Sequence, residues 1–309
     1  MSAAHLLKII DKERYIAHPI FIDRSGGWYL EDDKARPVTL SPIAPHMSVG
    51  GEELPVDVIF PMLHGDLGED GKISGIFECF GIPIVGCLTT AGALAGDKAL
   101  TKAVARSLGI PVAKDILVTK DEKTDSVIER AKELIGFPMF VKPTDLGSSV
   151  GARAAYTEEE LYVALNEARS LSGRVLIEEL IGDKREVECA YLGARGGEII
   201  TPPGEVILDG TYDYEKKYQG AGAVCISRAS LGDDIIEKIK DYTARLVRYI
   251  GIRQIARVDF FLTQVGVIFN EINTMPGFTG GSLYPRMIEA SGIPECELVT
   301  ELIEGALLE

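Results

Sequence analysis

The sequence has few of the residues that build disulfide or zinc frameworks. It holds five cysteines and four histidines in 309 residues, and no two cysteines have C-x-x-C spacing. An odd number of scattered cysteines argues against a disulfide framework and against a zinc site. We therefore expect buried free thiols and a cytoplasmic protein, because the cytoplasm keeps thiols reduced. The cysteines are Cys79, Cys87, Cys189, Cys225 and Cys296.

Positive charge and long apolar runs are also scarce. Lys and Arg total 32 against 47 Asp and Glu, which gives a formal net charge of -15. Nucleic acids and anionic membranes reward positive charge, so neither is expected as a main partner. No run approaches the roughly 18 to 20 apolar residues that cross a bilayer. Residues 1–10 include His5 and Lys8 and predict an amphipathic helix rather than a signal peptide.

The amino-terminal part has the pattern of a parallel β-α-β unit. With 46% hydrophobic residues, a chain of this length can bury two or three domain cores. The unit would place His64 near the carboxyl end of a strand, where α/β proteins bind ligands. A buried core histidine is the alternative for His64. The unit comprises a strand at 56–60, a glycine-rich loop at 61–71, a helix at 72–81 and a strand at 83–86.

The rest of the chain alternates helices and strands. We predict helices at 97–108, 158–170 and 233–250 and after Pro294, with Thr157 and Glu160 spaced as a capping box. Residues 208–223 follow no period, and a loop of that length is usually disordered or functional. The predicted strands are one ending at Lys142, a pair at 174–180 and 186–192, and a pair at 256–262 and 266–274.

Asp259, Glu271 and Asn273 form the strongest candidate metal site. Glu271 and Asn273 lie two residues apart and share one face of a strand, and Asp259 can join them from the preceding strand. Magnesium prefers such oxygen ligands together with nucleotide phosphates. Surface charges on edge strands are the alternative, but the apolar flanks VDFF and IFNEIN favour a buried site.

Lys142 and the glycine-serine turn after it predict a phosphate site. The backbone N–H groups of Gly147, Ser148, Ser149 and Gly151 can surround an anion. The segment is not a Walker A loop, and alone it is equally consistent with an ordinary turn. Lys98 begins a helix, where the backbone dipole also favours anions, although a lone lysine is usually a surface residue.

Further polar residues follow the predicted strands. Glu178 and Glu186 could accept hydrogen bonds from adenine and ribose, or simply face solvent. Arg257 shares a strand face with Asp259, which suits an anionic transition state or a structural salt bridge. In the loop NTMPGFTGGSLYP, the Gly277 amide can face an oxyanion and Ser282 can contact a carboxylate.

The ordered motifs resemble the D-alanine–D-alanine ligase family of the ATP-grasp superfamily. They are LHGDLGEDGKISGIFE, GDKA, VKPTDLGSSVG, IEELIGDKREVECA, YDYEKKY, RVDFF and NEINTMPGFTGGSLYP. The resemblance implies an α/β ATP-grasp fold with domains at 1–90, 91–176 and 177–309 and ATP between the last two. It also implies a homodimer that joins two D-alanine molecules for peptidoglycan synthesis.

The resemblance assigns roles residue by residue. Lys98, Lys142, Lys217 and Ser149 would contact phosphates, and Asp259, Glu271 and Asn273 would hold two magnesium or manganese ions. Glu178, Glu179 and Ile181 would contact adenine, and Glu186 the ribose. His64 would lie near the first substrate, and Ser282 and Leu283 near the second. Arg257 and the Gly277 amide would stabilise the oxyanion, with Ser148 and Tyr218 in the catalytic hydrogen-bond network.

The implied reaction passes through an acylphosphate, from which the loop at 208–223 would exclude water. Tyr218 and the apolar Leu283 favour D-alanine as the second substrate. A D-serine or D-lactate ligase and a nucleotide-binding remnant are the alternatives. Family members open with a glycine-rich strand and a glutamate-bearing turn, whereas this sequence begins at the helix that follows. We therefore assign no residue to that glutamate and expect weaker first-substrate binding and a less stable amino-terminal domain.

Overall fold

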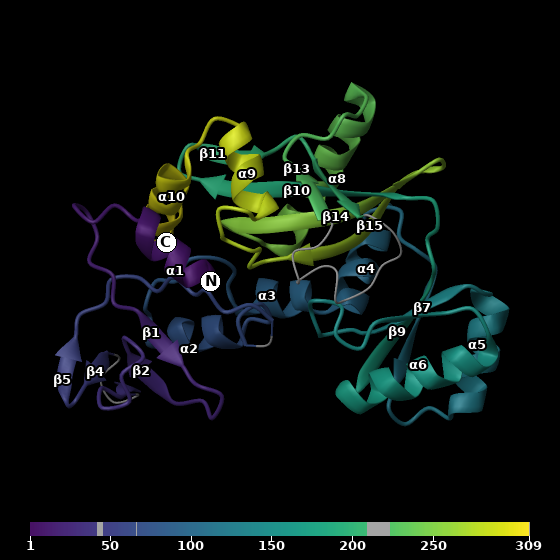
Figure 1. Cartoon of the computed structure of the whole chain (residues 1–309), viewed down its shortest axis with the longest axis horizontal. Coiled ribbons are helices and arrows are strands. Elements are labelled where there is room, and N and C mark those ends of the chain that lie inside the picture. The colour runs from purple at the N-terminus through teal and green to yellow at the C-terminus, as the bar shows by residue number, and fades with distance from the viewer. Residues whose placement is uncertain (42–45, 66, 209–222, 309) are drawn as a thin grey trace.

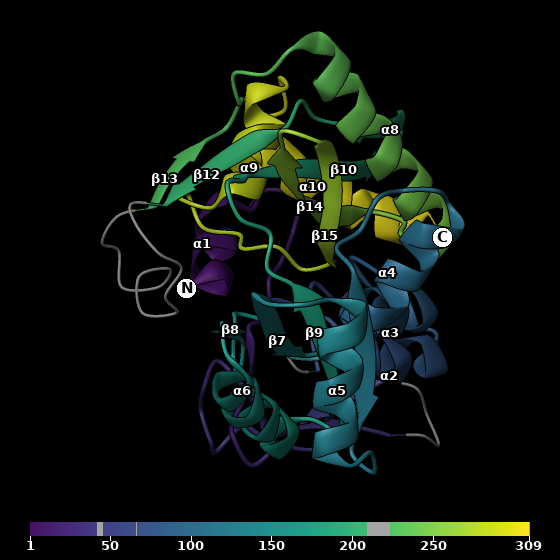
Figure 2. The same cartoon turned by 90° about the vertical axis from the view of Figure 1, so that its right-hand side faces the viewer.

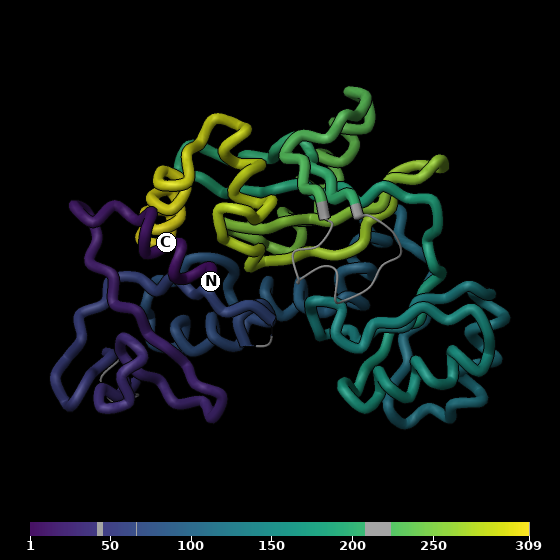
Figure 3. Tube along the Cα trace, in the orientation of Figure 1, coloured from purple at the N-terminus to yellow at the C-terminus, as the bar shows by residue number. Residues whose placement is uncertain are grey.

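The chain folds into mixed α/β groups of elements, as the computed structural model in Figure 1 shows. Residues from several of these groups line one cavity. The structure describes residues 1–41, 46–65, 67–208 and 223–308. The path can be followed in Figure 3, where the amino-terminal elements, the teal middle segment and the green-to-yellow carboxy-terminal part occupy different regions. The α/β class predicted from the sequence is confirmed.

The amino-terminal region contains small antiparallel sheets and helices. The elements are α1 (Ser2–Ile9), β1 (Ile20–Ile22), β2 (Trp28–Leu30), β3 (Val38–Leu40), β4 (Met47–Val49), β5 (Glu52–Leu54), α2 (Lys72–Phe80) and α3 (Thr89–Gly96). Helices α1 and α2 match the prediction. The parallel pairing predicted beside α2 is present between Ile59 and Ile84, but it is a single bridge and the predicted strand lengths are wrong. Pro55, Pro61 and Pro83 lack N–H donors, which limits a longer ladder.

The middle region is an antiparallel sheet covered by α5 and α6. Its elements are α4 (Lys98–Ser107), β6 (Asp115–Thr119), α5 (Thr124–Leu134), β7 (Met139–Pro143), β8 (Arg153–Ala155), α6 (Glu158–Leu171) and β9 (Arg174–Glu179). The strand order is β6-β9-β7-β8. The predicted cap is present, because Thr157 Oγ1 accepts from Glu160 N at 3.2 Å. All of β9 pairs in this sheet, so the division expected between residues 176 and 177 falls within a strand.

The carboxy-terminal region is built on a second, larger sheet with the path β13-β12-β10-β14-β15, while β11 pairs with β10. The two strands predicted from 174 to 192 therefore belong to different sheets. The elements are β10 (Arg185–Ala194), β11 (Gly197–Ile200), β12 (Gly204–Leu208), β13 (Ala223–Ile226), α8 (Asp233–Ile250), β14 (Ile255–Thr263), β15 (Gly266–Asn273), α9 (Leu283–Ala290) and α10 (Glu295–Leu307).

The two faces of the larger sheet are covered differently. Val187, Val258 and Phe260 pack against α8 on one face. On the other face, α9 and α10 cover Ala190, Leu192 and Ile255. Residues further along the same strands on that second face are polar, as alternation predicts for Glu188, Arg257 and Asp259. Figure 2 shows α8 on the outer side of this sheet and the smaller sheet below it.

The cysteines only partly match the expectation of buried thiols. Cys87 and Cys189 are buried, and burial raises the pKa of each thiol to about 12. Cys79 and Cys296 are exposed, so the expectation is wrong for these two. Within the described ranges, no helix combines the length and apolar character that a bilayer crossing requires.

Candidate active site

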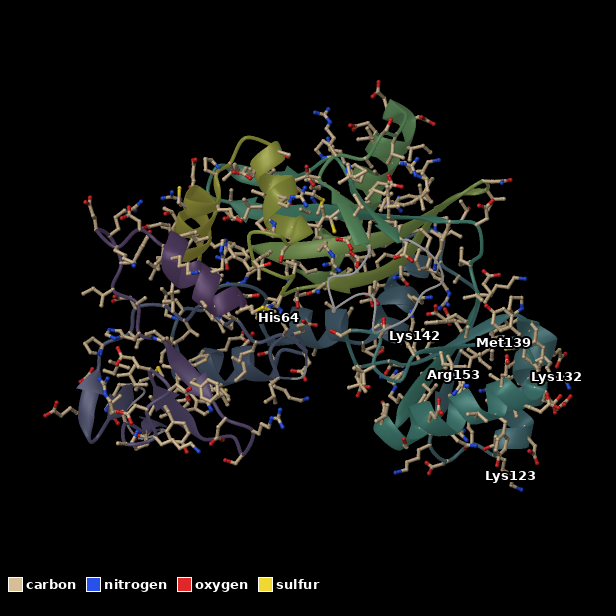
Figure 4. All side chains as sticks on the ribbon, viewed as in Figure 1. His64, Lys123, Lys132, Met139, Lys142 and Arg153 are labelled. Atoms are coloured by element: carbon tan, nitrogen blue, oxygen red, sulfur yellow. The ribbon has the colours of Figure 1, made fainter. Side chains whose placement is uncertain are left out.

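A cavity of about 590 Å³ lies where the sheet of β6 to β9 and the sheet of β10 to β15 meet the amino-terminal region. That volume is within the usual range for a small-molecule site. Figure 4 shows His64 and Lys142, which both line it, beneath the larger sheet. Residues predicted for the site that line this cavity are His64, Lys98, Lys142, Ser148, Ser149, Glu178, Glu179, Ile181, Arg257, Glu271, Asn273, Gly277, Ser282 and Leu283.

The register of β14 and β15 brings the predicted metal residues together. Arg257 lies opposite Asn273, and Asp259 lies opposite Glu271. Directly opposed residues project from the same face, so these side chains form one polar patch. A bulge follows between Asp259 and Phe260. It lets Asn270 line the cavity beside Glu271, where strict alternation would have turned Asn270 away.

Arg257 is held by two carboxylates. Its Nε and Nη2 donate to Asp259 Oδ1 and Oδ2, both at 2.8 Å, and Nε also lies 3.0 Å from Glu188 Oε2. Burial acts to lower the pKa of Arg257, but Asp259 and Glu188 raise it well above its ordinary value. The salt bridge considered for Arg257 is therefore present, and the guanidinium also reaches the cavity wall.

The oxygen groups of the patch suit a hard divalent cation. Glu271 Oε2 lies 3.5 Å from Lys98 Nζ, and Asn273 Oδ1 accepts from Met275 N at 2.9 Å. Among the residues that the structure describes, no cluster of three His, Cys, Asp or Glu side chains could hold a metal. The Glu271 carboxylate and the Asn273 amide oxygen line the cavity and fit magnesium that takes its other ligands from phosphates and water. Asp259 itself does not line the cavity.

Lys98 and Lys142 line the opposite side of the cavity, and the buried Lys102 lies behind them. Asp97 caps α4 by accepting from the backbone N–H groups of its first turn, and this places Lys98 at the helix start. Lys98 Nζ donates to Leu146 O at 2.8 Å. Lys142 Nζ and Lys102 Nζ lie 3.0 and 2.7 Å from Glu178 Oε1. Burial acts to raise the pKa of Glu178, but the two lysines lower it below its ordinary value.

The turn between β7 and β8 has the backbone geometry of an anion site. Ser148 and Ser149 have φ values of 54° and 59°, and Gly151 has 69°. Successive residues near the left-handed region can turn their N–H groups to one side. The positive φ of Gly151 favours glycine there, since other L-residues rarely adopt it.

A second group of residues lies at the other end of the cavity. His64 Nδ1 donates to Met275 O at 3.1 Å, since a carbonyl only accepts. In the neutral ring Nε2 then accepts from Ser2 Oγ at 2.8 Å. Ser282 Oγ accepts from Thr279 N at 3.0 Å, and Leu283 is 6% exposed. His64 is thus hydrogen-bonded and faces the cavity.

Some predicted residues lie elsewhere. Glu186 does not line the cavity, and Lys184 Nζ lies 3.5 Å from its Oε1. Lys217 and Tyr218 fall outside the described residues, as does nearly all of the predicted loop at 208–223.

Sequence reasoning missed several polar groups on or near the cavity. Glu188 resembled any strand residue, although its position two residues after Glu186 places both on one face. Lys102 follows Lys98 by one helical turn and was a findable signal. Lys184 stacks 3.8 Å from the centre of the Phe261 ring. Glu69 accepts from Gly65 N at 3.0 Å, and burial raises its pKa.

Comparison with protein families gives two matches that together cover most of the chain. The model described as D-ala D-ala ligase N-terminus matches residues 1–87, and the one described as D-ala D-ala ligase C-terminus matches residues 104–304.

Individual proteins give the same picture. A D-alanine–D-alanine ligase of Deinococcus radiodurans is 39% identical over 100% of this chain and 94% of its own length. One from Ruminiclostridium cellulolyticum is 38% identical over 99% and 90%. The structure of D-alanyl-alanine synthetase A from Vibrio cholerae matches with a TM-score of 0.91 at 31% identity, over 100% and 93%. The VanG D-Ala:D-Ser ligase from Enterococcus faecalis matches at 0.89 and 31%, over 99% and 94%.

Proposed function

Because this chain belongs to the D-alanine–D-alanine ligase family and has its ATP-grasp fold, we propose that it is an ATP-dependent ligase that joins two molecules of D-alanine. The observation that carries the proposal is the cavity, whose wall combines Lys98 and Lys142, Glu271 and Asn273, and Ser282 and Leu283. A proposed phosphate end and an apolar-walled acceptor end in one cavity suit a reaction that activates a carboxylate and then couples it to an amine.

The chemistry follows from the bonds that must change. A carboxylate oxygen of the first D-alanine attacks the γ-phosphorus, and the bond from that phosphorus to ADP breaks. The amine of the second D-alanine, having lost a proton, then attacks the acylphosphate carbonyl and expels phosphate. Phosphoryl transfer depends mainly on positioning and charge neutralisation. Lys98, Lys142 and Arg257 supply positive charge for both steps, and the Gly277 N–H would stabilise the oxyanion.

Nucleotide and metal binding are assigned to opposite walls of the cavity. Glu178, with the backbone near Glu179 and Ile181, would bind adenine, Glu186 the ribose, and Ser149 a phosphate. Asp259, Glu271 and Asn273 would hold magnesium, with manganese as a substitute. When bound, the metal neutralises phosphate charge. Lys217 would join the phosphate contacts, and Tyr218 would join Ser148 in the catalytic network.

The acceptor is proposed to be D-alanine rather than D-serine. Leu283 is nearly buried and lines the cavity, so the wall there is apolar. An apolar wall favours a methyl group over a hydroxymethyl group, although such a wall alone discriminates by only about 10- to 200-fold. The likeness to the VanG D-Ala:D-Ser ligase makes D-serine the competing acceptor to test.

The proposal includes where and how the enzyme works. We infer a cytoplasmic homodimer that supplies D-alanyl-D-alanine for peptidoglycan synthesis. We also propose three domains, the first at 1–90, with the boundary between the last two moved from residue 176 to after β9, and ATP between those two.

The direct test is to measure phosphate release from ATP and magnesium with D-alanine, D-serine or D-lactate, and to identify each product. We expect release with D-alanine and formation of D-alanyl-D-alanine. Preferred use of D-serine or D-lactate as second substrate would replace the proposed acceptor. ATP binding without substrate-dependent release would contradict the enzyme assignment.

A further inference from the structure

Lys102 is a buried cation that has no role in the proposed binding and catalysis. It lies in α4 with its side chain 1% exposed, and it is absent from the cavity wall. Its Nζ lies 2.7 Å from Glu178 Oε1. Burying an ammonium group is costly unless a partner compensates for lost water. The fold therefore retains at this point a charge whose only described ion-pair partner is a proposed nucleotide-binding residue.

Glu178 is shared by two lysines that differ in their access to the cavity. Lys142 Nζ lies 3.0 Å from the same Oε1 but belongs to the cavity wall, whereas Lys102 approaches from the protein interior. Both ammonium groups contact Oε1, and the Glu178 residue also belongs to the cavity wall. The Glu178 carboxylate is thus contacted by Lys102 from the interior and faces the cavity, where a base can donate a hydrogen bond to it.

We propose that Lys102 is a positioning residue that holds the Glu178 carboxylate in place for the nucleotide base and so leaves Lys142 able to bind phosphate. This inference rests on the proposed nucleotide site. Without Lys102, Lys142 would keep the one other ion pair that is described for Glu178 Oε1. A buried carboxylate with one partner holds that partner more strongly, so Lys142 would be drawn away from the phosphate.

The position of Lys102 in α4 supports this task. Lys98 and Lys102 are four residues apart and lie on the same face of the helix. Lys98 Nζ lies 3.5 Å from Glu271 Oε2 at the proposed metal end, and Lys102 contacts Glu178 at the proposed base end. Helix α4 therefore contacts both ends of the proposed nucleotide site. The direction of the Glu178 pKa shift agrees, because both lysines lower it against the effect of burial.

The test compares Lys102→Met with Glu178→Gln and with the double variant. Lys102→Met keeps the length of the side chain and removes its charge. We expect the KM for ATP to rise about tenfold, which corresponds to one lost charged interaction. The KM for D-alanine should change less than about twofold. The preference for ATP over GTP should also fall, because a less firmly ionised carboxyl can donate to a 6-oxo base.

The double variant decides whether Lys102 acts through Glu178. If it does, adding Lys102→Met to Glu178→Gln causes no further rise in the KM for ATP. Glu178→Gln alone leaves the buried Lys102 ammonium without the partner described for it. The double variant removes that charge, so it is expected to fold even where Glu178→Gln does not. The proposal would be overturned if the increases in KM for ATP of the two single variants added in the double variant. It would also be overturned if Lys102→Met left both the KM for ATP and the base preference unchanged.

Two matched controls separate positioning from general damage. Thr101→Val alters a fully buried neighbour on α4, and Lys132→Met makes the same chemical change in an exposed ion pair on α5. Figure 4 shows Lys132 on the outer side of the middle region. Neither variant should change the KM for ATP. Calorimetric binding of ADP with magnesium tests Lys102 even if D-alanine-dependent phosphate release is absent, so failure of the ligase assignment is distinguishable.

Discussion

Lys98 Nζ lies 3.5 Å from Glu271 Oε2, so the first turn of α4 and the end of β15 meet across the cavity. The lysine side chain is 13% exposed and the glutamate 30%, which leaves both within reach of a ligand. The residue proposed to bind phosphate and the residue proposed to bind metal are thus held next to each other. This pairing is the arrangement needed by a metal–nucleotide complex, whose charges alternate along the phosphate chain.

Glu271→Gln tests the metal site. The amide keeps the shape and one oxygen but loses the negative charge, so magnesium binding should weaken. We expect kcat to fall at least about 100-fold at fixed magnesium, in keeping with the usual effect of removing one catalytic charge. The dependence of rate on magnesium concentration should shift to higher values. Glu237→Gln, in an exposed pair with Lys240, is the matched control. Undiminished activity of Glu271→Gln would refute the metal assignment.

Arg257→Lys tests the oxyanion assignment. Lysine keeps the charge but cannot donate to both Asp259 oxygens while reaching Glu188, as the guanidinium does. We expect kcat to fall by about 10²- to 10³-fold. The KM for ATP should stay within about threefold, because the fork stabilises charge that develops during the reaction. A rise in KM at constant kcat would instead place Arg257 in ground-state nucleotide binding.

Leu283→Asn tests the choice of acceptor. The change places a polar group on an apolar part of the cavity wall, where it can bond a hydroxyl. The ratio of kcat/KM for D-serine to that for D-alanine should rise about tenfold. Leu283→Met keeps the volume and polarity class and should leave the ratio within about twofold. Equal ratios in all three proteins would show that position 283 does not read the acceptor side chain.

Glu205→Gln tests an ion pair remote from the chemistry. Arg185 Nε and Nη2 donate to the two Glu205 oxygens, both at 2.7 Å, and Arg185 lowers the pKa of Glu205. A lowered pKa stabilises the fold above the ordinary value of 4.5, and this contribution is lost as pH falls through the folded-state value. We expect the variant to be about 1 kcal/mol less stable at neutral pH, since Arg185 is partly exposed.

Urea unfolding of both proteins at neutral pH and near pH 3 measures this difference. The two midpoints should converge at the acidic pH. A difference that persists there would show that packing, rather than the charge of Glu205, sets its contribution.

The periodic parts of the fold were predictable from the sequence. The alternation of RVDFF and NEIN was enough to place Asp259, Glu271 and Asn273 on one face, because side-chain direction follows from strand geometry. Helix α8 follows its apolar period and ends at Gly251, as its left-handed φ of 82° favours.

Pairing and burial were not predictable in the same way. The bulge that brings Asn270 to the cavity depends on the register between two strands, which no single strand specifies. The parallel unit expected around residue 59 is a single bridge in the structure. Its extent was not predictable, because an apolar run between prolines does not show how many of its N–H groups can pair. The burial of Lys102 was not predicted, because only tertiary packing brings this lysine against Glu178.

The most direct test of the proposed ligase is to supply D-alanine whose carboxylate carries heavy oxygen, together with ATP and magnesium, and to analyse the phosphate by mass spectrometry. If the carboxylate attacks the γ-phosphorus and phosphate then leaves the acylphosphate, one heavy oxygen should appear in phosphate for every D-alanyl-D-alanine formed. Phosphate without the label, released while the dipeptide accumulates, would contradict the acylphosphate route.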